Sequence, residues 1–307
     1  MIRIVFRFLL VCLFTVSFAA SFAQPRPLTL ATYTYADNNR LGNIGPLAEV
    51  LSRKLGIPVR TRSYENVKQF IAGLEAGEVD IALISTFGYL LLINRGNSPY
   101  TPAAALEVPE GVRDNYKSAI VVHASLPIRQ LSDLKAHAAD YRMTFVSETS
   151  TSGNLIPRAF LSANGLTEPE RQFLQVTYSK THAEGLTALL DRRTDLAAFG
   201  SEEYHKALRH DPGLTHQVRL LWESEEIPLG PVLLKNSLDS AQRQKITHAL
   251  LALHRKHSDA LESLRAGWSE ARQAEKFRPV DRAFYESYRQ RIGASQGLIE
   301  QFSGLIR

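Results

Sequence analysis

The chain of 307 residues carries 36 lysines and arginines against 31 aspartates and glutamates, which gives a formal net charge of +5. This mild excess has no long basic run behind it, so the composition does not indicate nucleic-acid binding. The length suits two domains of ordinary size, each with its own core. Cys12 is the only cysteine.

The first 23 residues have the pattern of a secretory signal peptide. They contain Arg3 and Arg7, then an apolar run over residues 8–20, and they end in small residues before Gln24. A membrane anchor fits less well because the run is shorter than the ~20 residues that span a bilayer. We therefore expect cleavage after residue 23 and export to the periplasm. Removal of the two arginines lowers the formal net charge from +5 to +3.

Cleavage also removes the one thiol, which excludes disulfides, cysteine nucleophiles and thiolate metal sites from the mature chain. The mature chain has no further apolar run long enough for a transmembrane helix.

Strand-like and helix-like segments alternate at the start of the mature chain. Such alternation is typical of parallel strands joined by crossover helices, with ligands bound at the carboxyl ends of the strands. Those ends are residues 33–38, Tyr64-Glu65 and Ser85-Thr86. The expected elements are a strand at 28–32, a helix at 46–55, a strand at 59–63, a helix at 66–75 and a strand at 79–84.

A second unit repeats this order. We expect a charged helix at 201–210 to face water. The strands at 218–222 and 232–235 then return toward the first unit, so the chain crosses between two lobes twice. The expected members of the second unit are strands at 119–122, 143–146, 173–178 and 196–199 and helices at 131–135, 155–163 and 183–192, and an amphipathic helix at 241–256 follows them.

These patterns predict a two-lobed α/β protein. Residues 28–118 and 233–307 form lobe 1, and residues 119–232 form lobe 2. No low-complexity linker separates the lobes, so we expect them to hinge through the crossing segments around a cleft.

A dense hydroxyl cluster follows the strand at 143–146. Ser150, Thr151 and Ser152 stand just before a helix whose first turn we expect to contain Pro157, with its cap near Gly153 or Asn154. Unpaired N–H groups and the helix dipole make a helix N-terminus suited to an anion. The alternative is that these residues only cap the helix, since Ser, Thr and Asn are good caps.

Other motifs favour structural roles. Gly293-Ala294-Ser295-Gln296-Gly297 has the G-x-S-x-G spacing, but a polar segment precedes it where a nucleophile elbow needs an apolar strand. His254 and His257 lack further ligands at metal-binding spacing. Asp80 and Asp195 are expected at polar strand entries.

The segment Ser150-Thr151-Ser152-Gly153-Asn154-Leu155-Ile156-Pro157-Arg158-Ala159 resembles the periplasmic binding proteins of phosphate, phosphite and phosphonate ABC transporters, the PhnD-like family. The resemblance extends in family order through nearly the whole mature chain. Its other segments are Pro46-Leu47-Ala48, residues 76–82, Tyr116-Lys117-Ser118, residues 131–135, Gly267-Trp268 and Phe277-Arg278.

The resemblance implies a type II periplasmic binding protein, in which each lobe has a mostly parallel sheet flanked by helices and the ligand lies in the cleft. It implies that Ser150, Thr151 and Ser152 hold the oxygens of an oxyanion. It also suggests Tyr64 as a donor from lobe 1 and His182 as a residue that faces the cleft. We expect Ser85 and Thr86, at the end of a lobe 1 strand, to complete the site.

Two departures from the family leave the ligand open. Aminoalkyl-phosphonate binders place a carboxylate directly after the histidine, where this chain has Ala183, and Glu184 lies about 100° further around the helix. Ile84-Ser85 stands where an aromatic-glycine pair is expected. Phosphate, phosphite, a small alkyl phosphonate or another anion therefore remain possible ligands.

The leading hypothesis is a non-enzymatic, monomeric binding protein without cofactor or metal that delivers an oxyanion to an ABC permease. A second hypothesis keeps the binding fold but passes the signal to a membrane sensor. A third is an exported hydrolase that uses Ser152 and His182, which ranks last because nothing positions an acid behind the histidine.

Overall fold

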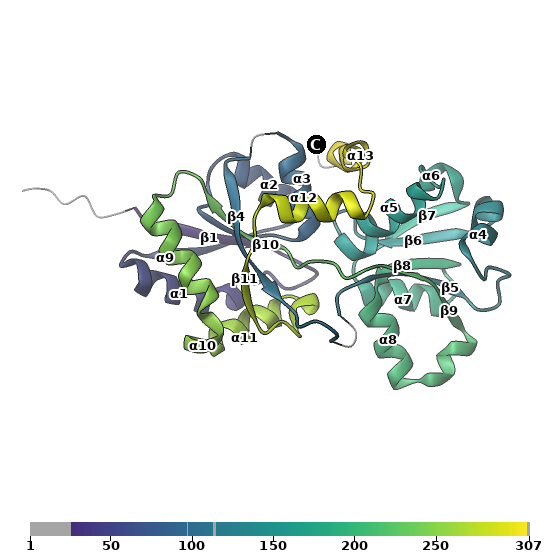
Figure 1. Cartoon of the computed structure of the whole chain (residues 1–307). Coiled ribbons are helices and arrows are strands. Elements are labelled where there is room, and N and C mark those ends of the chain that lie inside the picture. The colour runs from purple at the N-terminus through teal and green to yellow at the C-terminus, as the bar shows by residue number, and fades with distance from the viewer. Residues whose placement is uncertain (1–25, 97, 113–114, 306–307) are drawn as a thin grey trace, which may run out of the picture.

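The computed structural model describes residues 26–96, 98–112 and 115–305. The predicted signal peptide lies outside these residues. Two β-sheets, each covered by helices, form two lobes that lie side by side (Figure 1). The predicted two-lobed α/β class is confirmed. No helix in the described ranges is both long and apolar enough to cross a membrane.

The sheet of lobe 1 has six strands in the order β11-β4-β10-β3-β1-β2. β1 runs parallel to β2 and β3, as predicted, whereas β10, β4 and β11 add antiparallel pairs. The strands are β1 (Leu28–Tyr33), β2 (Val59–Tyr64), β3 (Ile81–Leu83), β4 (Tyr100–Glu107), β10 (Pro231–Lys235) and β11 (Lys276–Pro279).

Helices cover both faces of this sheet. One apolar cluster unites the sheet with α1, α9, α10 and α11, and another unites its opposite face with α2, α3, α12 and α13. The helices are α1 (Leu41–Leu55), α2 (Val67–Glu75), α3 (Thr86–Asn94), α9 (Ser240–Leu251), α10 (Leu253–Lys256), α11 (Ser258–Gly267), α12 (Arg282–Arg291) and α13 (Gln296–Leu305).

The sheet of lobe 2 has five strands in the order β7-β6-β8-β5-β9. β6 is parallel to β7 and β8, but β5 is antiparallel to β8 and β9, so both sheets are mixed rather than mostly parallel. The elements are β5 (Ser118–His123), β6 (Arg142–Val146), β7 (Gln175–Ser179), β8 (Leu196–Gly200), β9 (Val218–Glu223), α4 (Leu131–His137), α5 (Ile156–Ala163), α6 (Pro169–Gln172), α7 (His182–Leu190) and α8 (Ser201–His210).

The chain passes from lobe 1 to lobe 2 between β4 and β5 and returns between β9 and β10 (Figure 1). The two crossing segments are hydrogen-bonded to each other, because Ile227 N donates to Tyr116 O at 2.8 Å and Ser224 N donates to Ser118 O at 2.9 Å. β9 stays in lobe 2. The limits of the lobes at 118/119 and 232/233 remain a prediction.

Two lobe 1 helices differ from expectation. α1 begins at Leu41, so Pro46 lies inside the helix. Pro46 has no N–H to donate to the Gly42 carbonyl, which accepts the Ser263 hydroxyl at 3.2 Å instead. The unpredicted α3 is buried from Thr86 to Ile93, so its sequence is apolar all round and lacks the periodicity of a surface helix.

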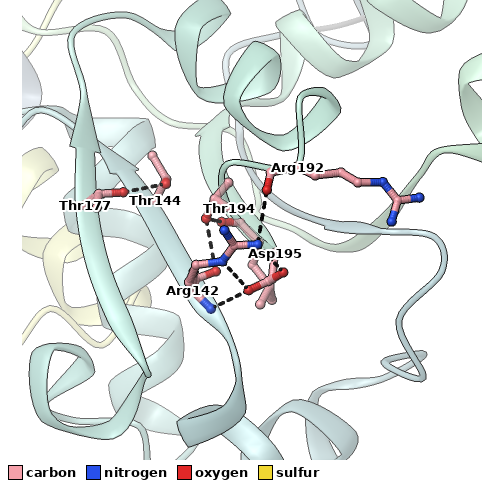
Figure 2. Close-up of polar contacts among 7 residues, drawn as sticks. Arg142, Thr144, Thr177, Arg192, Thr194 and Asp195 are labelled. Carbon is pink, nitrogen blue, oxygen red and sulfur yellow. Dashed lines mark hydrogen bonds and ion pairs between the residues drawn. The ribbon is translucent and has the colours of Figure 1, made fainter.

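Asp80 and Asp195 have matching structural roles in the two lobes. Asp195 binds the Arg142 side chain in a bidentate pair at 2.9 and 3.0 Å and accepts Arg142 N at 2.8 Å, which joins β6 to the start of β8 (Figure 2). Asp80 likewise accepts Thr29 N of β1 at 2.8 Å and pairs with Arg26. Burial raises the pKa of Asp195, but the hydrogen bonds from Arg142 bring it below its usual value. Both carboxylates are therefore structural.

Candidate functional site

The serine-rich turn forms the first turn of a helix. Residues Thr151–Leu155 make a single π-turn, η2, which continues into α5. Ser150 is the cap, because its hydroxyl accepts Gly153 N at 3.1 Å. The cap predicted near Gly153 or Asn154 is therefore wrong by three or four residues. The wider π-turn accommodates Pro157 inside the helix, and the Ser152 carbonyl near it accepts the Ser118 hydroxyl at 2.6 Å.

This helix start faces the N-terminus of α3 from the other lobe. Thr151 is 4% exposed, and its hydroxyl accepts Phe87 N across the interface at 3.2 Å. Ser85 caps α3 through Gly88 N at 3.1 Å. The Thr86 hydroxyl donates to the carbonyl of Pro228, in the returning crossing segment, at 2.6 Å. Two helix N-termini, each partly positive, thus meet at the interface between the lobes.

His182 is the first residue of α7 and lies beside this junction. Its Nδ1 accepts Gly200 N at 3.0 Å. Burial lowers the pKa of His182 to about 4, so the ring is neutral at pH 7. A neutral ring that accepts at Nδ1 carries its proton on Nε2, which leaves Nε2–H as a donor.

Ser152 and His182 converge on Gly200. A Cβ placed on Gly200 would lie 3.5 Å from Ser152 Oγ and 3.7 Å from His182 Nδ1. Glycine at this position therefore keeps the space between the two side chains open. Ser152 is fully buried, and among the described residues its hydroxyl has no hydrogen-bond partner of normal geometry, although the Tyr116 phenol lies near it. The buried hydroxyl of Ser201, next to Gly200, also has none within that part of the chain.

Tyr116 brings a phenol to the same place from the crossing segment. Burial raises its pKa well above the usual value, and the neighbouring hydroxyls of Ser152 and Thr151 lower it in part. In the sequence, Tyr116-Lys117-Ser118 stands out only as a segment that resembles the family, and Tyr116 was not predicted to belong to the site.

A small cavity of about 20 Å³ lies here and has an acidic wall. It is lined by Tyr116, Lys117, His182, Gly200, Glu202, Glu203, Ser269 and Glu270. The expectation that the helix at 201–210 faces only water is thus wrong at its first turn, where Glu202 and Glu203 reach the cavity. Burial raises the pKa of Glu202. Glu184 is exposed, and its carboxylate accepts Lys180 N at 2.8 Å.

Tyr64 lies apart from these residues. Its ring packs over Gly73 of α2, and its hydroxyl donates to Glu78 at 2.9 Å. The structure therefore brings Thr151, Ser152 and His182 together. The helix starts at Ser150 and at Ser85-Thr86 lie beside them, whereas Tyr64 does not.

The other motifs have structural roles or lack partners. Ser295 of the G-x-S-x-G pattern caps α13 through Leu298 N at 3.1 Å. In the described ranges, no three His, Cys, Asp or Glu side chains are grouped to hold a metal ion.

Two mixed sheets, two crossing segments and facing helix N-termini between the lobes define a two-lobed solute-binding protein. The sequence matches, over residues 33–283, the family described as ABC transporter, phosphonate, periplasmic substrate-binding protein. The chain belongs to this family, whose members are periplasmic substrate-binding proteins and not enzymes. The predicted family and the predicted non-enzymatic role are confirmed.

The chain is similar in sequence to a curated protein and in fold to two solved structures. The chain is 23% identical over 260 residues to the phosphonates-binding periplasmic protein of Escherichia coli K12, which covers 83% of this chain and 75% of that protein. It resembles the structure of PhnD1 from Prochlorococcus marinus (MIT 9301) in complex with methylphosphonate, with a TM-score of 0.64, 18% identity and 89% and 98% of the two chains covered. It also resembles XAC2383 from Xanthomonas citri bound to ATP, with a TM-score of 0.70, 20% identity and 90% and 98% covered.

Proposed function

We propose that this protein binds a phosphonate or a related phosphorus oxyanion between its lobes and delivers it to an ABC permease. The observation that carries the proposal is the group of buried hydroxyls without partners at Ser152 and Ser201, beside facing helix N-termini. Buried polar groups are nearly always hydrogen-bonded. Unpaired hydroxyls next to Gly200, which lines the cavity, therefore indicate a ligand with matching acceptors.

The proposed site takes its donors from lobe 2 and from the crossing segment. Ser152, Tyr116 and His182 Nε2–H supply hydrogen bonds from lobe 2 and the hinge, and the N–H groups at the start of η2 add the helix dipole. Thr151 is placed to exchange its bond from Phe87 N for one with the ligand. Ser150, Ser85 and Thr86 hold the two helix starts in position.

The acidic wall favours a phosphonate whose organic group carries a positive charge. Glu202, Glu203 and Glu270 line the cavity next to the hydroxyl cluster, where they would repel a bare phosphate dianion. An ammonium group on the ligand would pair with them, while its phosphonate group binds the hydroxyls. Aminoalkyl phosphonates are therefore candidate ligands despite Ala183, because the carboxylates come from α8 and, for Glu270, from the short helix after α11, and not from the position after the histidine.

A cavity of about 20 Å³ has room for about one water molecule, so entry of a larger ligand requires the lobes to move apart. Opening through the two crossing segments and closure on a ligand that touches both lobes is the hinge motion we propose. A role in sensing needs the same cleft and differs only in the membrane partner.

A thermal-shift screen of residues 24–307 tests the proposal, because a ligand that binds only the folded form raises the melting temperature. The screen compares 2-aminoethylphosphonate, methylphosphonate, phosphite, phosphate and sulfate. We expect the largest shift with 2-aminoethylphosphonate, and Glu202→Gln should reduce that shift more than the methylphosphonate shift. If the wild type and Glu202→Gln gave equal shifts with 2-aminoethylphosphonate, the amine subsite would be refuted. No shift of the wild type with any phosphorus oxyanion would refute the proposed function.

A further inference from the structure

Tyr35 is a lobe 1 residue that faces the proposed site but was not predicted to belong to it. It lies in the loop between β1 and α1, at the carboxyl end of β1. The ring centroids of Tyr35 and His182 are 6.4 Å apart, so this side chain reaches across to lobe 2. Tyr35 therefore occupies the interface that closes around a ligand.

The Tyr35 hydroxyl is buried and has no hydrogen-bond partner of normal geometry among the described residues. It faces the backbone N–H of His182, at the N-terminus of α7, which lowers its pKa in part. Burial and the nearby carboxylate of Glu270 outweigh this effect and raise the pKa of Tyr35 to about 12. The phenol is thus protonated at neutral pH and has its O–H available to donate.

A stack of side chains holds the loop that carries Tyr35. The buried Arg40 guanidinium lies 5.4 Å from the Tyr35 ring centroid and 4.4 Å from that of Trp268. Arg40 Nε donates to Gly267 O at 2.9 Å, and Arg40 N donates to Asn38 Oδ1 at 2.8 Å. Such cation–π and hydrogen-bond contacts restrict the position of the phenol.

Arg40 adds an electrostatic contribution at the same place. The residue is 3% exposed, and within the described residues its guanidinium donates to the carbonyl oxygens of Gly267 and Tyr33 and not to a carboxylate. A buried cation that no carboxylate neutralises directly attracts an anion more strongly than it would in water.

We infer that Tyr35 is the lobe 1 residue that donates a hydrogen bond to the bound oxyanion, with Arg40 as the residue that positions it. This inference rests on the proposed function, because it assumes an oxyanion between the lobes. The phenol then provides the contact that makes the affinity of the ligand depend on closure.

The test compares Tyr35→Phe with the matched control Tyr64→Phe, because the Tyr64 hydroxyl is bonded to Glu78 away from the cavity. Calorimetric titrations with 2-aminoethylphosphonate and with methylphosphonate give the dissociation constants. A hydrogen bond from a neutral donor to a charged group is worth about tenfold or more in affinity, so Tyr35→Phe should weaken binding by about tenfold. Tyr64→Phe should leave the dissociation constant unchanged.

The outcomes separate the two proposals. If the wild type binds neither phosphonate, the proposed function is wrong. If the wild type binds and Tyr35→Phe binds equally well, Tyr35 is not a ligand donor. Melting temperatures measured without ligand test whether each variant is folded. Tyr35→Phe should melt like the wild type, because it removes only an unpaired hydroxyl.

Trp268 gives a second readout of the same inference. The chain has two tryptophans, and Trp222 stacks on Phe160 in lobe 2 at 4.0 Å. Trp222→Phe leaves Trp268, next to Arg40, as the only tryptophan of the chain. Ligand should change its emission, with a midpoint about tenfold higher when Tyr35→Phe is added. An unchanged midpoint would overturn the inference.

Discussion

Thr151 connects the two lobes through one hydroxyl group, which accepts Phe87 N at 3.2 Å. Replacement by valine keeps the shape but removes the hydroxyl. We expect Thr151→Val to weaken phosphonate binding by about tenfold, because a hydrogen bond to a charged group is worth roughly 1.5–3 kcal/mol. Calorimetry measures this loss.

Thr177→Val is the matched control, since Thr177 is exposed on β7 and its hydroxyl bonds to the Thr144 hydroxyl at 2.7 Å (Figure 2). It should bind like the wild type. Equal affinity in Thr151→Val and the wild type would remove Thr151 from the site.

His182 makes the stability of the free protein depend on pH. Its pKa is about 4 in the folded protein, against 6.5 in an unfolded chain. As the pH falls from 6.5 toward 4, His182 becomes protonated in the unfolded chain but stays largely neutral in the folded protein, so the folded state loses stability. The loss approaches roughly 3 kcal/mol at the low end of this range.

His182→Asn keeps an acceptor for Gly200 N but has no ring to titrate. Urea unfolding between pH 7 and pH 4.5 should therefore show a smaller loss of stability in the variant, by roughly 2–3 kcal/mol. A dependence on pH remains in both proteins, because burial also lowers the pKa of His123. Identical pH profiles would contradict the assignment.

At the scale of elements, Gly153 fixes the position of the η2 helix start on β6. A Cβ at this residue would lie 2.5 Å from Val146 Cβ, inside the van der Waals limit. Gly153→Ala should therefore displace the N-terminus of η2, destabilise the fold by about 1–3 kcal/mol and weaken ligand binding. Unfolding curves and titrations measure the two effects.

Gly45→Ala is the matched control, because no atom lies within 4 Å of a Cβ at Gly45. Alanine favours a helix interior, so this variant should gain about 0.5–1 kcal/mol without any change in binding. If Gly153→Ala behaved in the same way, the close approach to Val146 would not position the site.

The sequence predicted those elements whose apolar pattern is local. The alternation of β1, α1, β2, α2 and β3 was correct, and so were α8 at 201–210 and the parallel group of β6, β7 and β8. β4 and β11 were not predicted, because strands made of alanines with Pro102, or of four residues, lack a clear alternation. The antiparallel direction of β5 depends on its partners in the sheet and not on its own residues.

The site was predictable where motif and helix end coincide, as at Ser150, Thr151 and Ser152. It was not predictable where packing decides the direction of a side chain. Gly73 leaves room for the Tyr64 ring to turn toward Glu78, and nothing near Tyr64 in the sequence indicates this. Tyr116 lies between predicted elements, and its role appears only when the two lobes meet.

At the scale of the molecule, binding is coupled to the arrangement of the lobes. Apolar contacts already join them, since Leu155 and Ala159 of lobe 2 share a buried cluster with Phe87 and Phe302 of lobe 1. The C-terminal helices α12 and α13 lie along the upper side of the junction in Figure 1. A ligand that bonds to both lobes shifts the equilibrium toward the closed arrangement.

Small-angle scattering detects this shift in the whole chain. We expect the radius of gyration to fall when 2-aminoethylphosphonate saturates the protein, and Thr151→Val should need about ten times more ligand for the same change. An unchanged radius of gyration at saturation would show that the ligand does not close the lobes.

Calorimetric titration of residues 24–307 with 2-aminoethylphosphonate tests the central claim most directly, because it measures affinity and stoichiometry together. One ligand per chain, with weaker binding in both Thr151→Val and Tyr35→Phe, is the predicted result. Binding that neither substitution weakens would contradict a site shared by the two lobes.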